Sequence, residues 1–107
     1  MKATLLISLA LFSNVAFAND FYSRYLIETS GCQDQSRQMQ QISTFFHCVV
    51  GALETIKGDP YFVDYRTDAD ILIERNAKRA SAWEEYENFK ISEKELNVIL
   101  GKIDRNE

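Results

Sequence analysis

The fold is decided by the stretch Ser36–Lys57, which reads SRQMQQISTFFHCVVGALETIK. Apolar residues recur in it at intervals of three and four, the spacing that keeps side chains on one face of an α-helix. They are Met39, Ile42, Phe46, Val49, Leu53 and Ile56. The stretch therefore predicts a long amphipathic helix. It also contains Cys48, the one cysteine in the chain besides Cys32.

These two cysteines predict one disulfide. Bridged Cα atoms lie within about 7 Å of each other. A helix that began at Asp34 would carry Cys48 about 21 Å from its start, too far for Cys32 to reach. We therefore expect Ser36 to cap the helix and residues 32–35 to double back in an extended conformation. A metal site is the weaker alternative, because one Cys pair and a single His lack a fourth ligand.

The beginning of the chain has the pattern of an export signal. A short basic head precedes an apolar run and then Ala16-Phe17-Ala18, the small-x-small pattern that signal peptidase cuts. The apolar run is shorter than the roughly 20 residues that a membrane span needs. We predict a signal peptide over residues 1–18 and a periplasmic or secreted mature chain that begins at Asn19. A disulfide fits an oxidising compartment of this kind.

Length and charge limit the organisation and the partners of the predicted mature chain, residues 19–107. It has eleven basic and sixteen acidic side chains, a net charge near −5. Nucleic-acid binding needs a clustered positive surface, and so does docking on anionic lipid. We therefore expect no nucleic acid and, after signal cleavage, no membrane as a partner. The length suffices for one domain.

One further helix is predicted before the central stretch and one after it. The first runs from Asn19 or Asp20 to about Thr29 and stops at Gly31. Its expected inner face consists of Phe21, Tyr22, Tyr25, Leu26 and Thr29. The third helix is expected from about Asp68 to Asn88. Its apolar stripe consists of Ala69, Ile73, Ala77, Ala80, Trp83 and Tyr86.

The last helix has the clearest start signal. Ser92 and Glu95 have the spacing of a capping box, and Ile91 and Leu96 have the spacing of a hydrophobic staple across it. Its expected inward side chains are Leu96, Ile99, Leu100 and Ile103. Together these elements predict an all-α fold, a small single-domain bundle of about four helices stapled by one disulfide, over residues 19–107.

Residues 59–70 form the least regular segment of the predicted domain, and we expect an ordered loop there. Its candidate partner-binding residues are Tyr61, Phe62, Asp64 and Tyr65. Aromatic side chains are enriched at interface centres, and carboxylates steer a basic partner toward them. The alternative is that Phe62 and one of the tyrosines belong to the core.

Catalytic chemistry finds little support in the sequence. His47 neighbours Cys48, but adjacent helical residues point about 100° apart and an oxidised cysteine is no nucleophile. Glu84, Glu85 and Glu87 follow one another closely on a predicted helix, as solvated carboxylates do. We expect no enzyme and no cofactor.

A calcium site is also a weak hypothesis. Asp64, Asp68, Asp70 and Glu74 lack the order of an EF-hand loop and the glycine that bends it. Asp68 and Asp70 are ordinary residues for the first turn of a helix. We expect no metal.

The plan of the chain resembles the periplasmic immunity proteins that neutralise peptidoglycan amidases delivered by type VI secretion. The resemblance rests on a short first helix ending near Cys32, on Phe46-His47-Cys48-Val49-Val50-Gly51, and on the helix start Ile91–Leu96. Gly51 is displaced from the usual spacing, and the further cysteines common near the C-terminus of that family are absent. The resemblance implies a protein without catalytic residues that sterically occludes the substrate groove of an effector.

The sequence thus predicts a periplasmic protein-binding module, in its most concrete form an immunity protein that inhibits a secreted cell-wall hydrolase such as an amidase. A periplasmic stress chaperone is the alternative, and a small hydrolase is the third hypothesis. A homodimer is left open.

Overall fold

The structure, a computed structural model, describes residues 20–106, and every regular element in that range is helical. The predicted all-α bundle stapled by one disulfide is confirmed. The predicted signal peptide, residues 1–18, and Asn19 lie outside the described residues. The elements are α2 (Asp20–Glu28), α3 (Cys32–Met39), α4 (Ile42–Lys57), the 3₁₀-helix η1 (Pro60–Tyr65), α5 (Arg66–Glu87) and α6 (Glu93–Asp104).

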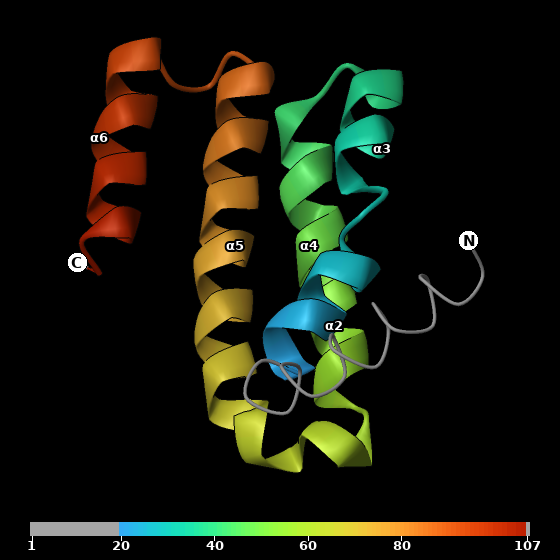
Figure 1. Cartoon of the computed structure of the whole chain (residues 1–107). Coiled ribbons are helices and arrows are strands. Elements are labelled where there is room, and N and C mark those ends of the chain that lie inside the picture. The colour runs from blue at the N-terminus through green and yellow to red at the C-terminus, as the bar shows by residue number, and fades with distance from the viewer. Residues whose placement is uncertain (1–19, 107) are drawn as a thin grey trace, which may run out of the picture.

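The antiparallel pair α4 and α5 forms the centre of the molecule (Figure 1). Helix α3 packs on the other side of α4, α2 packs on α4, and α6 lies beyond α5. Val49, Leu53 and Ile56 of α4 are at most 1% exposed, as the periodicity predicted. Ala69 and Ala80 of α5 are also fully buried, and their small side chains allow close approach of the two long helices.

The predicted single helix over Ser36–Lys57 and the extended return over residues 32–35 are wrong. Residues 32–39 are helical, and the helix is interrupted at Gln40, which is left-handed at φ 55 and ψ 37, and at the extended Gln41. Ser36 caps nothing: its hydroxyl donates to the Gln41 carbonyl oxygen at 2.7 Å. The expectation failed because two antiparallel helices joined by a two-residue turn also return Cys32 to Cys48.

Two of the expected apolar positions lie at that turn and are not core residues. Met39 is 60% exposed and Ile42 is 43% exposed. The spacing of apolar residues by three and four continues across the turn although the helix is interrupted there, so the periodicity did not reveal the interruption.

Helix α2 confirms the predicted bounds within one residue but not the predicted inner face. Tyr22 and Leu26 are 59% and 50% exposed, whereas Phe21 and Tyr25 pack against the buried cluster around Cys32. The inner side of α2 is thus the side that packs on the fully buried Cys32 at the start of α3.

The end of the chain agrees closely with the sequence. The Ser92 hydroxyl accepts from the Glu95 backbone N–H and the Ser92 N–H donates to the Glu95 carboxylate, both at 3.1 Å, which confirms the capping box. Leu96 and Ile103 are buried against α5. On α5 the predicted stripe fails at Ala77, which is exposed; Asn76 is buried instead and donates to the Leu72 carbonyl oxygen at 2.8 Å.

Candidate functional site

The ordered loop expected over residues 59–70 is wrong. Residues 60–65 form the 3₁₀-helix η1, drawn yellow-green between α4 and α5 in Figure 1, and residues 66–70 are the start of α5. Asp59 begins η1: the Oδ1 atom of Asp59 accepts from the Tyr61 backbone N–H at 3.0 Å, and Pro60 occupies the first helical position. An N-cap followed by proline is a helix start signal. The expectation of an irregular loop missed this signal.

The side chains of η1 are divided between the core and the surface, and the helix is kinked at Phe62, whose φ of −103 and ψ of 26 are not helical. Phe62 and Tyr65 lie on the inner side. Phe62 is 5% exposed and meets the Phe21 ring at 6.4 Å between centroids, and Tyr65 stacks on the same ring at 5.2 Å. Both side chains belong to the contact between η1 and α2.

The other face of η1 is open to solvent. Tyr61 is 65% exposed, Val63 is 50% exposed and Asp64 is exposed. We call these three residues the η1 surface. Sequence reasoning named Tyr61 and Asp64 but missed Val63, which the helix start at Pro60 would have indicated.

Hydrogen bonds hold Tyr61 of the η1 surface in place although its side chain is exposed. The Tyr61 hydroxyl donates to the Asp20 Oδ2 atom at 2.5 Å, and this bond raises the pKa of Tyr61 above its usual value. The Tyr61 ring also packs edge-on against Phe62, with centroids 4.9 Å apart. The ring is therefore fixed at both ends.

An ion-pair network joins η1 to α2. The Arg24 guanidinium donates to Asp59 at 3.0 Å and to Glu28 at 2.9 Å, and it lies 5.7 Å from the centroid of the Phe62 ring. Bonds from the Tyr61 N–H and then from Arg24 lower the pKa of Asp59, while Glu28 and Asp59 raise the pKa of Arg24. These contacts fix η1 against the bundle.

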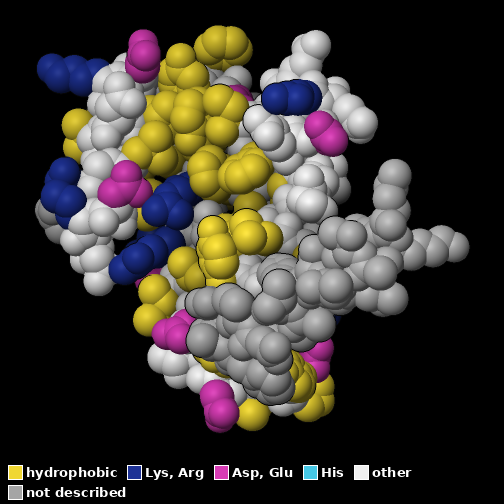
Figure 2. All heavy atoms as spheres, viewed as in Figure 1, with side chains coloured by type: hydrophobic (Ala, Val, Ile, Leu, Met, Phe, Trp, Pro, Cys, Tyr) yellow, Lys and Arg dark blue, Asp and Glu magenta, His cyan; other side chains and the backbone are white. Residues whose placement is uncertain are grey.

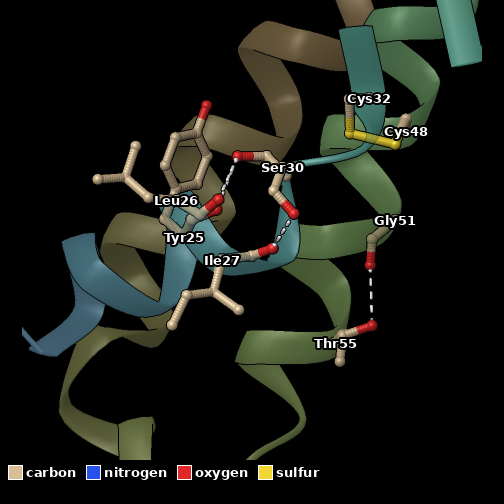
Figure 3. Close-up of a disulfide and its surroundings, with 9 residues drawn as sticks. Tyr25, Leu26, Ile27, Ser30, Cys32, Cys48, Gly51 and Thr55 are labelled. Carbon is tan, nitrogen blue, oxygen red and sulfur yellow. Dashed lines mark hydrogen bonds between the residues drawn. A yellow bond between two sulfur atoms is a disulfide. The ribbon is translucent and has the colours of Figure 1, made fainter. Parts of the chain in front are cut away.

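The disulfide predicted between Cys32 and Cys48 is confirmed, with the two Cα atoms 5.5 Å apart (Figure 3). It joins the first residue of α3 to the middle of α4. Neighbouring His47 points elsewhere, with its Nε2 atom in hydrogen-bond contact with the Glu84 carboxylate of α5.

Glu87, another of the carboxylates expected to be solvated, caps α4 from α5. Its Oε2 atom accepts from the Ile42 N–H at 2.5 Å, and its Oε1 atom accepts from the Ser43 hydroxyl at the same distance. The N-cap residue Gln41 supplies no side-chain bond. Contacts between residues 44 or 45 positions apart in the chain carry no local sequence signal.

The four acidic residues considered for calcium are not brought together as a site. Asp70 pairs with Lys57 at 2.5 Å, and Glu74 pairs with Lys78 at 3.1 Å. Over residues 20–106, no group of three His, Cys, Asp or Glu side chains is arranged to hold a metal ion. Within the same range no helix combines the length and the apolar character required to cross a membrane.

Comparison with protein-family models, with curated proteins and with solved structures finds no match to this chain. The fold and the geometry of the η1 surface therefore carry the functional argument.

Proposed function

We propose that this chain is a periplasmic protein-binding module that sterically inhibits a secreted cell-wall hydrolase. The observation that carries the proposal is the η1 surface, where exposed Tyr61 and Val63 stand on a backbone fixed by Asp59. A binding surface that is ordered before association loses less conformational entropy when it binds. The identity of the target as a wall hydrolase rests on the family resemblance.

Charge favours a basic partner for this surface. Asp64 belongs to the surface itself. Asp20 accepts from the Tyr61 hydroxyl, Asp59 begins η1, and Asp68 lies in the first turn of α5. Carboxylates around an aromatic contact raise the association rate of a positively charged partner and fix its orientation. Tyrosine is among the residues that contribute most to binding when buried at an interface centre.

The chain offers a matched pair of variants for the test. Val63 on η1 and Val98 on α6 are 50% and 51% exposed, so a lysine at either position meets a similar solvent environment. The protein is titrated into a panel of purified peptidoglycan amidases and muramidases while hydrolysis of peptidoglycan is followed. We expect stoichiometric inhibition of at least one enzyme, weakened about tenfold or more by Val63→Lys, since a positive charge facing a basic partner costs at least about 1.4 kcal/mol.

Val98→Lys should inhibit as the unmodified protein does. Equal inhibition by both variants would exclude the η1 surface as the binding site. If no enzyme of the panel is inhibited, the hydrolase-inhibitor function is wrong.

A further inference from the structure

A second exposed surface lies at the end of the bundle opposite η1, where the α3–α4 turn and the α5–α6 turn meet (Figure 1). We call residues 39–42 and 86–91 the bundle tip. Apolar side chains of both turns are open to solvent there: Met39 is 60% exposed, Ile42 is 43% exposed and Phe89 is 95% exposed. Figure 2 shows hydrophobic side chains gathered at this end of the molecule and reaching its outermost surface.

Phe89 occupies a backbone position that suits glycine. Its φ is 60, in the left-handed region, and it follows Asn88, the C-cap of α5. The Phe89 N–H donates to the Tyr86 carbonyl oxygen at 3.0 Å, and the Lys90 N–H donates to the Glu85 carbonyl oxygen at 2.8 Å. These two bonds form a Schellman motif, whose left-handed residue is usually glycine because any side chain there is unfavourable. Since the ring is almost wholly exposed, packing within the single chain does not explain a phenylalanine at this position.

A groove beside Phe89 has room for an aromatic ring. The groove has a volume of about 380 Å³ and opens between the two turns. Both turns supply its lining: Gln40, Gln41, Tyr86, Glu87, Phe89 and Ile91. A cavity of about 150 Å³ is large enough for benzene, so one phenyl ring fits into the groove. The ring of Phe89 does not fill the groove of its own chain, because it is 95% exposed.

A second copy of the chain matches both features of the bundle tip at once. A two-fold axis between Phe89 and the groove places the Phe89 ring of each copy opposite the groove of the other, so two equal contacts form and the assembly closes as a dimer. The charges agree with this arrangement. The exposed Lys90 follows Phe89, and Glu87 lines the groove, so each Lys90 approaches a carboxylate of the other copy.

We infer that the bundle tip is a homodimer interface in which Phe89 of each copy inserts into the groove of the other. Two phenylalanine side chains bury about 300–500 Å², whereas a stable interface buries roughly 1,200–2,000 Å². The dimer is therefore weak, populated at millimolar concentration and dissociated at low micromolar concentration. It leaves the η1 surface of each copy free at the far end, so the inference does not depend on the function proposed for that surface.

Sedimentation equilibrium of the oxidised protein, from low micromolar to millimolar concentration, measures the association. We expect the average mass to rise from that of the monomer toward that of the dimer and no further. Phe89→Gly removes the ring and suits the left-handed backbone, so this variant should stay monomeric at every concentration without unfolding at a lower urea concentration than the unmodified protein. As the control, Ile27→Ser removes a 68% exposed side chain of α2, outside the bundle tip, and should dimerise as the unmodified protein does.

A mixture of two proteins tests the insertion itself. Phe89→Gly lacks the ring but keeps the groove, so the Gln41 and Ile91 backbone NMR signals of the ¹⁵N-labelled variant should shift saturably when unlabelled, unmodified protein is added. Adding unlabelled Phe89→Gly instead should cause no shift. The inference is overturned if the unmodified protein stays monomeric up to millimolar concentration, if it associates beyond the dimer, if Phe89→Gly dimerises equally well, or if the mixture leaves the groove signals unchanged.

Discussion

Asp59 shows how much one side chain can determine in a domain of this size. One of its carboxylate oxygens starts η1 through the Tyr61 N–H, and the other binds Arg24 of α2. The start signal is local and readable from Asp59-Pro60. The partner Arg24 lies 35 positions earlier in the chain, so this contact cannot be read from the local sequence.

The lowered pKa of Asp59 makes a prediction about stability and pH. Because the pKa is lower in the folded chain than in the unfolded one, the ionised carboxylate stabilises the fold above the unfolded value of about 3.9 and this contribution is lost as the pH falls through the folded value. Asp59→Asn keeps an oxygen for the cap but removes the charge. The variant should melt at a lower temperature than the parent protein at pH 7, and the difference should shrink as the pH falls through the folded-state pKa of Asp59.

Thermal melts between pH 7 and pH 2.5 measure this difference, with Asp64→Asn on the open face of η1 as the control. The control should melt with the parent protein throughout. A difference for Asp59→Asn that stays constant over the whole range would contradict a stabilising contribution from the ionised carboxylate, which accepts from the Tyr61 N–H and from Arg24.

At the scale of elements, the local signals of the α6 capping box and of the end of α4 were read correctly, but the local start signal at Asp59-Pro60 was missed. The long-range signal of the cysteine pair was misread. The capping box of α6 and the helical stop after Lys57 are determined by neighbours in the chain. The turn between α3 and α4 is determined by the return of Cys32 to Cys48, and both helices satisfy the same apolar spacing. Periodicity therefore predicted the helical face without predicting that there were two helices.

The left-handed backbone of Gln40 predicts opposite effects of glycine at two nearby glutamines. A non-glycine residue in this conformation costs about 1–2 kcal/mol, so Gln40→Gly should raise the free energy of unfolding by up to about 1 kcal/mol after the entropy of glycine in the unfolded chain is subtracted. Gln38→Gly, inside α3, should lower it by about 1 kcal/mol. Urea unfolding of the two variants measures both changes. If both destabilised the protein alike, residue 40 would have to be helical.

The candidate site was also only partly readable at this scale. Tyr61, Phe62, Asp64 and Tyr65 were named because aromatic and acidic residues alternate there. Their division into a buried and an exposed face depends on the helix η1, whereas a loop was expected there. Val63 escaped notice because the helix start at Asp59-Pro60 was not recognised.

For the whole molecule, the disulfide is a single covalent contribution to stability that reduction can remove. The cysteines are 16 positions apart, a loop whose closure is worth about 3 kcal/mol in the chain-entropy model. A domain of this length has about 5–10 kcal/mol of net stability. The bond therefore supplies a substantial fraction of the total.

Urea unfolding of the oxidised and the reduced protein should differ by about 3 kcal/mol. Cys32→Ala combined with Cys48→Ala is the control, because its stability should resemble that of the reduced protein and should not respond to reductant. Identical unfolding curves for the oxidised and the reduced parent protein would show that packing alone holds α3 to α4.

The two-residue turn at Gln40 and Gln41 has a consequence for the order of events during folding. Both sulfur atoms, the turn and the helices that carry them lie within residues 32–57, so in an oxidising compartment the covalent bond can close before α5 and α6 have docked. α5 and α6 then dock onto α3 and α4, which the disulfide already joins, and they do not determine which thiols pair.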